Sequence, residues 1–167
     1  MGVDTITFGK CVVSWNEGFE FPVSVNHNKL NGDKPLAVVT DITYDFLGFK
    51  VVIPKGFAFD GASIPWLFQW MPGYSKIGWH LFADLIHDFS CDFPDKVPRP
   101  VGDGIYLGLL LAIADKPVDG SDMSLKGWQK ITRRRKRQAW IMHQAVSFWT
   151  LIQWGRGVNI LSIGVLT

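Results

Sequence analysis

The chain has 167 residues, a length that suits a single domain, and its 14% aromatic content can supply a core that needs no disulfides. Its formal net charge of +2 gives no overall attraction toward nucleic acids or anionic membranes. The only two cysteines, Cys11 and Cys91, form no CxxC pair, which excludes a structural zinc knuckle and favours free, mostly buried thiols.

The first ten residues and the apolar stretches of the chain do not predict targeting to a membrane. Residues 1–10 contain no basic segment followed by an apolar run, so we expect no signal peptide. The longest apolar stretches are 105–114, which is too short to cross a bilayer, and 139–154, which is interrupted by polar residues. We therefore expect buried helices at both places and no membrane span.

The first 60 residues have the pattern of short strands joined by tight turns. Segments rich in Val, Ile, Phe and Thr alternate with breaks that contain Gly and Asn, as at Asn31-Gly32. A tight connection is expected at 46–49, around Gly48. Because the breaks are too short for helical crossovers, we expect antiparallel pairing. The predicted strands are 5–8, 10–14, 19–24, 37–44 and 50–53.

The remainder of the chain predicts coil followed by helices. Residues 54–73 are punctuated by Pro and Gly, and we expect ordered coil there. Helices are predicted from 74 to about 90, over 101–115, and from Ser124 as N-cap to about 154, with the tail at 155–167 a strand or irregular. The fold class is therefore α+β, with an antiparallel β-rich half followed by about three helices packed against it, in one domain over 1–167.

Asp60 is the first candidate for chemistry, within Phe59-Asp60-Gly61-Ala62-Ser63-Ile64-Pro65. The small residues after Asp60 let the backbone turn and leave its carboxylate accessible to a metal, a proton or a histidine. An Asx-turn is the structural alternative. A G-x-S-x-G elbow is absent, so Ser63 is interpreted as a turn residue and not as a nucleophile.

His87 and Asp88 are the second candidates. His80, Asp84 and His87 recur at i, i+4 and i+7 and share one helical face. Imidazoles and carboxylates on one stripe could hold a divalent metal, with zinc favoured. Ionisable groups on an apolar helix are costly unless they are paired or coordinated, which indicates a role for them. The alternative has His87 bonded to a backbone carbonyl and Asp84 facing solvent.

Two further features are open to more than one interpretation. Asp103 follows Arg99 at the start of the second helix, where it could be an N-cap, an ion-pair partner of Arg99, or a carboxylate aimed at His87-Asp88. The basic run at 133–137 is consecutive and must spread around its helix. A solvated face is favoured over a nucleic-acid contact, because the net charge is low and no second basic cluster exists.

The segment from Pro54 to Pro65 resembles the family called domain of unknown function 1353, whose pattern is a strand ending in Pro-x-Gly-Phe and then Thr-Asp-Gly-Ala-Ser-Ile-Pro. Ala83-Asp84-Leu85-Ile86-His87-Asp88 matches the family's second element, and Arg99 with Asp103 fits the third approximately. Phe59 stands where Thr is usual. The resemblance covers about residues 50–150 and implies a phage or prophage origin. It adds weight to Asp60, His87 and Asp88, and it supplies no activity.

Two hypotheses for the function follow, and the sequence leaves open whether the protein is an enzyme. In the first it is a metal-dependent hydrolase of a peptide or cell-wall bond, with His87, Asp60 and Asp103 as ligands of one divalent ion and Asp88 and Asp60 as catalytic groups. In the second it is a non-enzymatic virion or assembly protein that contacts other phage proteins through aromatic surface, and Asp60, His87 and Asp88 form a structural polar clamp. Either role places it in the virion or in the cytoplasm of the infected host.

Overall fold

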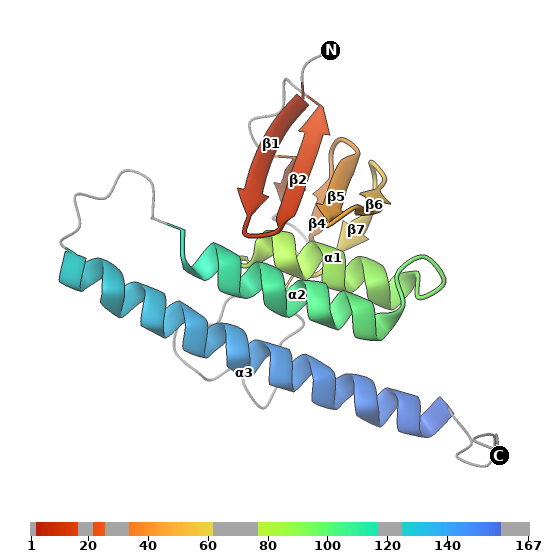
Figure 1. Cartoon of the computed structure of the whole chain (residues 1–167). Coiled ribbons are helices and arrows are strands. Elements are labelled where there is room, and N and C mark those ends of the chain that lie inside the picture. The colour runs from red at the N-terminus through yellow and green to blue at the C-terminus, as the bar shows by residue number, and fades with distance from the viewer. Residues whose placement is uncertain (1–2, 17–21, 26–33, 62–76, 117–124, 158–167) are drawn as a thin grey trace.

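The computed structural model describes residues 3–16, 22–25, 34–61, 77–116 and 125–157, without the side chains of Leu125 and of 149–157. Figure 1 shows three layers, with the strands on one side of α1 and α2 and with α3 on the other. The described strands are β1 Val3–Phe8, β2 Cys11–Asn16, β3 Val23–Val25, β4 Leu36–Val38, β5 Ile42–Phe46, β6 Phe49–Ile53 and β7 Ala58–Phe59. The helices are α1 Leu81–Asp92, α2 Arg99–Ala114 and α3 Leu125–Gly157. The predicted α+β class is confirmed.

The strands form two antiparallel sheets. The first has the order β1-β2-β5-β6, and the second has the order β3-β4-β7. The predicted tight connection is confirmed, because β5 turns into β6 through Leu47 and Gly48, both at positive φ. Gly48 donates its N–H to Oδ1 of Asp45, which closes the turn.

Several predicted boundaries are wrong. The single strand expected at 37–44 is two strands in different sheets, since the chain bends between Val38 and Ile42. The residues of 37–44 are mostly ones that favour strands, so their types alone do not reveal such a bend. The short strand β7 lies inside the segment expected to be coil, and α3 continues to Gly157, into the predicted tail. The turn at Asn31-Gly32 and the expected N-cap Ser124 lie outside the described residues.

The core lies between the sheets and the α1–α2 layer. Its largest completely buried side chains include Tyr44, Phe59 and Phe89, so one strand of each sheet packs on the helices. Cys11 is buried and Cys91 partly buried, both as free thiols, as expected. Within the described residues, no helix combines the length and apolar character needed to cross a bilayer.

Tyr44 joins the first sheet to α1 through a hydrogen bond that can be tested. Its hydroxyl donates to the backbone oxygen of Phe82 at 2.7 Å, in a completely buried position. Tyr44→Phe removes this bond and little packing volume, so we expect a loss of about 1 kcal/mol in the free energy of unfolding. Urea denaturation checks this value. An unchanged midpoint would contradict a contribution of the bond to stability.

Candidate functional site

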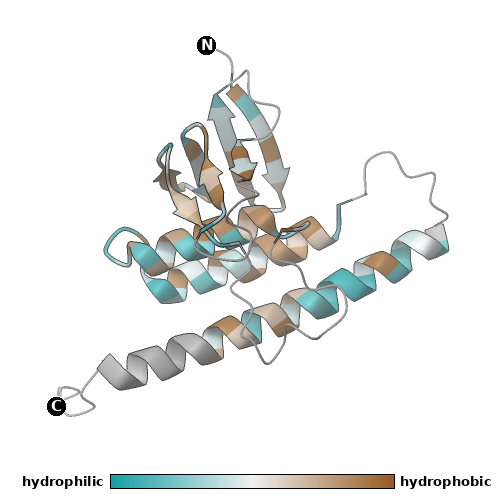
Figure 2. Ribbon diagram, turned by 180° about the vertical axis from the view of Figure 1, so that it is seen from behind, coloured by the Kyte–Doolittle hydropathy of each residue, from teal (hydrophilic) through white to brown (hydrophobic). Residues whose placement is uncertain are grey.

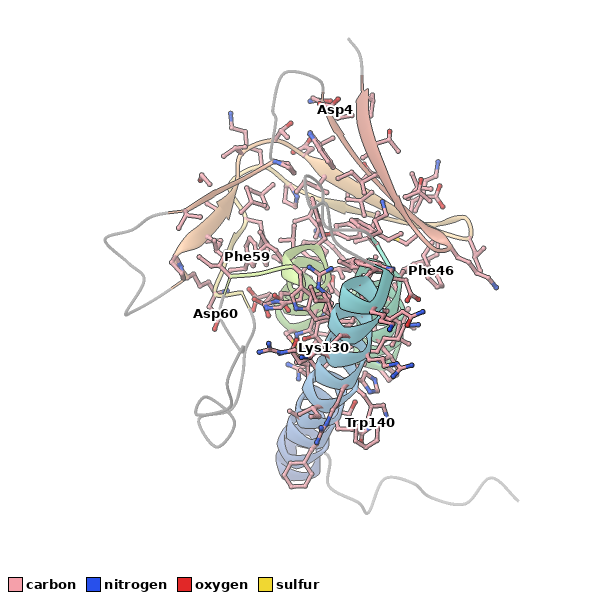
Figure 3. All side chains as sticks on the ribbon, turned by 90° about the vertical axis from the view of Figure 1, so that its left-hand side faces the viewer. Asp4, Phe46, Phe59, Asp60, Lys130 and Trp140 are labelled. Carbon is pink, nitrogen blue, oxygen red and sulfur yellow. The ribbon has the colours of Figure 1, made fainter. Side chains whose placement is uncertain are left out.

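Asp60 is placed by the end of β7. Phe59 is completely buried and pairs with Leu36 of β4, and Asp60 follows it in a half-buried position. Gly61, at φ +79°, then turns the chain in a conformation that favours glycine. Figure 3 shows Phe59 in the interior and Asp60 beside it, where the sheets meet the helices. Because β7 packs on α1, the Asp60 carboxylate lies next to that helix.

Asp88 of α1 forms a close carboxyl pair with Asp60. Burial raises the pKa of Asp88 well above its usual value, and the charge and side chain of Asp60 raise it further, whereas the Asp60 backbone opposes the shift. Among the described residues, Oδ2 of Asp88 has no partner at hydrogen-bond distance. The pair favours a state in which Asp88 keeps its proton.

His87 lies beside this pair and reaches α2. Its Nδ1 is 3.5 Å from Oδ1 of Asp88, and its Nε2 is 3.6 Å from Oδ1 of Asp103 and from Sγ of Cys91. Burial lowers the pKa of His87, but the hydrogen bond and charge of Cys91 and the charge of Asp103 raise it, and the net shift is upward. His87 thus faces carboxylates and a thiol, and no described contact joins its ring to a backbone carbonyl.

Asp103 faces this cluster from α2. The expectation that it caps the helix is wrong, because Pro98 is the N-cap and Asp103 lies beyond the first turn. Burial raises the pKa of Asp103, while the charges of His87, His143 and Arg99 lower it. The charge of Arg99 lowers the pKa of Asp103 from a distance, since the described residues include no ion pair between the two. Asp103 therefore lies where the third interpretation places it, facing His87, and its functional role stays a prediction.

His80 and Asp84 form a separate buried pair at the start of α1. Nδ1 of His80 hydrogen-bonds to Oδ2 of Asp84, and the hydroxyl of Tyr106 donates to Oδ1 at 3.3 Å. The expectation that Asp84 could face solvent is wrong, since it is 1% exposed. Burial raises the pKa of Asp84, and its bonds to His80 and Tyr106 oppose that shift. This pair ties α1 to α2 beneath the cluster.

Three members of the site were missed from the sequence. Cys91 stands one helical turn after His87, and this spacing could have indicated it. The Tyr106 ring lies 5.0 Å from the His87 ring and comes from α2. His143 of α3 acts on Asp103 across a helix interface that no local pattern predicts. Ser63, interpreted above as a turn residue, lies outside the described residues.

The predicted metal site stays a prediction. In the described part of the chain, no three or more His, Cys, Asp or Glu side chains form a group that could hold a metal ion. Two of the expected ligand atoms, Nε2 of His87 and Oδ1 of Asp103, are 3.6 Å apart. Two tetrahedral ligands at about 2.1 Å from zinc would be separated by about 3.4 Å. The spacing of His87 and Asp103 therefore suits two ligands of one cation. The third expected ligand, Asp60, lies beside Asp88.

Chemically, the cluster combines acids and a base around one buried point. Asp88 and Asp103 lie 3.5 Å and 3.6 Å from the two ring nitrogens of His87, and Asp60 adds a third carboxyl beside Asp88. Titratable groups with shifted pKa values that lie together in a buried site are suited to donating and accepting protons. The arrangement can therefore move protons, or it can hold a cation that replaces one.

Comparison with known proteins identifies the central part of the chain. A family model described as "Protein of unknown function (DUF1353)" matches residues 36–125, which is more than half of the sequence. The match extends from β4 to the first residue of α3 and contains every residue of the predicted site. No curated protein and no solved structure matches the chain.

Proposed function

Since the chain belongs to the DUF1353 family of proteins of unknown function, we propose its function from the site itself. It is a hydrolase of a peptide or cell-wall bond in which Asp60 and Asp88 are the acid–base pair. The observation that carries this proposal is the close approach of two carboxyls, one of them buried with an oxygen that has no described partner. The phage setting implied by the resemblance belongs to the same proposal.

Two neighbouring carboxyls contribute little to the stability of a fold, and this supports a catalytic role for Asp60 and Asp88. Two ionised carboxylates repel, and a buried charge without a cation is costly. Asn at position 88 would fill the same space and donate a hydrogen bond to Asp60 without that cost. A costly buried group of this kind is typical of functional sites.

The two carboxyls take different roles because their burial differs. Asp88 is buried and holds its proton, so it is the general acid, whereas the more exposed Asp60 is the general base. Asp60 removes a proton from the attacking water, and Asp88 protonates the leaving nitrogen or oxygen as the bond breaks. His87 and Asp103 orient Asp88 and keep the surrounding charge near balance. Amide and glycosidic bonds need such protonation of the leaving group.

The activity is tested with dye-labelled peptidoglycan and a dye-labelled unfolded protein as substrates. We expect the wild type to release dye from one of them, and Asp60→Asn to lower the rate by at least about 100-fold. Asp95→Asn is the matched control, because Asp95 is an exposed carboxylate outside the cluster. The proposal fails if folded wild type releases dye from neither substrate, or if the two variants are equally active.

A divalent metal ion, zinc by its donor types, is a separate part of the proposal, with His87, Asp103 and Asp60 as ligands. It would supply a positive charge that compensates the carboxyls and lowers the pKa of a bound water. Elemental analysis of wild type and His87→Ala tests it independently of activity. A stoichiometric metal that is lost in the variant supports the ion. An active, metal-free wild type leaves the carboxyl pair alone responsible.

The clamp is the second candidate, and one observation favours it. Asp60 approaches Asp88 with its backbone as well as its side chain, so the residue after β7 is attached to α1. Such an attachment suits a non-enzymatic virion or assembly protein that binds other phage proteins through aromatic surface. The stability of an Asp88 variant distinguishes the two functions, as argued below.

A further inference from the structure

The charges of this chain are segregated along its sequence. All 15 acidic residues precede residue 123, whereas eight of the 17 basic residues follow it. The segment that forms α3 therefore carries positive charge only, and the rest of the chain is net acidic. The balanced total of +2 conceals this division. Charge asymmetry of this kind indicates an anionic partner for the basic part.

Four of the positive charges of α3 form a stripe on its exposed face. Lys126, Lys130, Arg133 and Arg137 are separated by four, three and four residues, which places them on one side of a helix. All four are exposed, and none forms an ion pair within the described part of the chain. The opposite side of α3 packs on α2 through Ala139, Met142 and Val146.

The basic run at 133–137 divides between structure and surface. Arg135 lies with its guanidinium 5.7 Å from the Trp79 ring, and Lys136 pairs with Asp115 at 2.8 Å. Arg133 and Arg137 are exposed and belong to the stripe. Figure 2 shows hydrophilic residues concentrated over this part of the helix.

Two large aromatic side chains continue the same face. Trp140 is 60% exposed and Phe148 is 65% exposed, with exposed Gln144 between them. Figure 3 shows Trp140 projecting outward from α3. Exposed apolar surface of this size on a helix whose opposite side packs on α2 indicates a contact surface. The face is thus cationic in its first part and aromatic in its second.

We propose that this face of α3, defined by Lys126, Lys130, Arg133, Arg137, Trp140 and Phe148, lies on an anionic bilayer surface. The cations contact lipid phosphates, and the two aromatic side chains enter the interface between head groups and acyl chains. The helix lies parallel to the membrane and does not cross it. This proposal is independent of the hydrolase, and its residues lie outside the family match at 36–125.

The order of the side chains favours a bilayer over a single-stranded nucleic acid. Nucleic-acid grooves place aromatic residues among the cations, because bases alternate with phosphates along the strand. Here the four cations come first and the aromatic residues follow them. Trp is also enriched at membrane–water interfaces, because its ring is apolar and its N–H can remain hydrated.

Vesicle flotation of the complete protein tests this inference, with phosphatidylcholine alone and phosphatidylcholine mixed with phosphatidylglycerol. We expect binding to the mixed vesicles only. Each cation near the surface contributes about fivefold, so the double variant Arg133→Gln/Arg137→Gln should lower the partition coefficient about 25-fold. Lys10→Gln/Lys55→Gln is the matched control, because it removes the same charge from exposed positions between strands.

A second pair of variants separates the aromatic contribution. Trp140→Ala/Phe148→Ala should weaken binding to mixed vesicles, whereas Phe49→Ala, at an exposed position of β6, should not. A fluorescent single-stranded oligonucleotide provides the competing partner. Binding of the oligonucleotide without vesicle binding overturns the proposal in favour of nucleic acid. Binding to neither partner, or equal loss in the Lys10/Lys55 control, also overturns it.

Discussion

Replacing Asp88 with asparagine is expected to raise the stability of the protein at neutral pH while it lowers the proposed hydrolytic activity. The asparagine amide can donate to the Asp60 carboxylate at any pH, whereas Asp88 must hold a proton to avoid a buried charge beside Asp60, at a cost that rises with pH. We expect a gain of about 1 kcal/mol in the free energy of unfolding, typical of removing a costly functional group. Loss of the general acid should lower the hydrolytic rate by at least about 100-fold.

The stability gain should depend on pH in a definite direction. The pKa of Asp88 is raised in the folded state, so the fold binds this proton more tightly than the unfolded chain does. Wild-type stability is therefore favoured below the ordinary pKa of 3.8 and declines as the pH rises through the folded pKa. Asparagine has no such titration. Its advantage over the wild type should appear above about pH 4 and increase with pH.

Thermal unfolding of wild type and Asp88→Asn between acidic and neutral pH measures this effect without a substrate. Asp95→Asn should follow the wild-type curve throughout, because Asp95 is exposed and outside the cluster. If Asp88 is instead half of a structural clamp, its replacement removes a favourable contact with His87 and the melting temperature falls at neutral pH. That result would favour the assembly protein over the hydrolase.

Local spacing was enough to find the centre of this site. Asp60 follows an apolar segment and precedes small residues, and His87 with Asp88 lies on an apolar helix, so both positions are unusual in their surroundings. Cys91 follows the same helical spacing, but its thiol gives no signal by itself. His143 reaches Asp103 only because α3 packs on α2, and this packing cannot be read from either segment alone.

The fold, like the site, could be predicted from the sequence only in its local features. Periodicity gives the class and order of the elements, because the α+β pattern depends on local residue types. It does not give the bend that separates β4 from β5, or the pairing of Leu36 with Phe59 that places Asp60. Those features depend on contacts between distant segments. The cationic stripe is not apparent from the total charge or from the run at 133–137 alone, because it also includes the cations at 126 and 130.

Gly102→Ala is expected to separate α1 from α2 at the site and to destabilise the protein. A Cβ at position 102 would lie 2.5 Å from Cβ and 2.3 Å from Oγ of Ser90. The Ser90 Cβ is fixed to the α1 backbone and cannot rotate away, so the helices must move. Ser90 donates to the backbone oxygen of His87, and Gly102 precedes Asp103. The displacement therefore acts on the His87–Asp103 contact.

We expect Gly102→Ala to lower the free energy of unfolding by about 2 kcal/mol, because overpacking costs up to about 3 kcal/mol and alanine returns up to about 1 kcal/mol as a better helix former. Gly104→Ala is the matched control, since a Cβ there meets nothing within 4 Å. It should leave the stability unchanged or raise it slightly. Urea denaturation compares the two variants, and Ser90→Gly combined with Gly102→Ala should recover part of the loss. If Gly102→Ala is as stable as Gly104→Ala, the close approach of α1 and α2 does not hold His87 against Asp103.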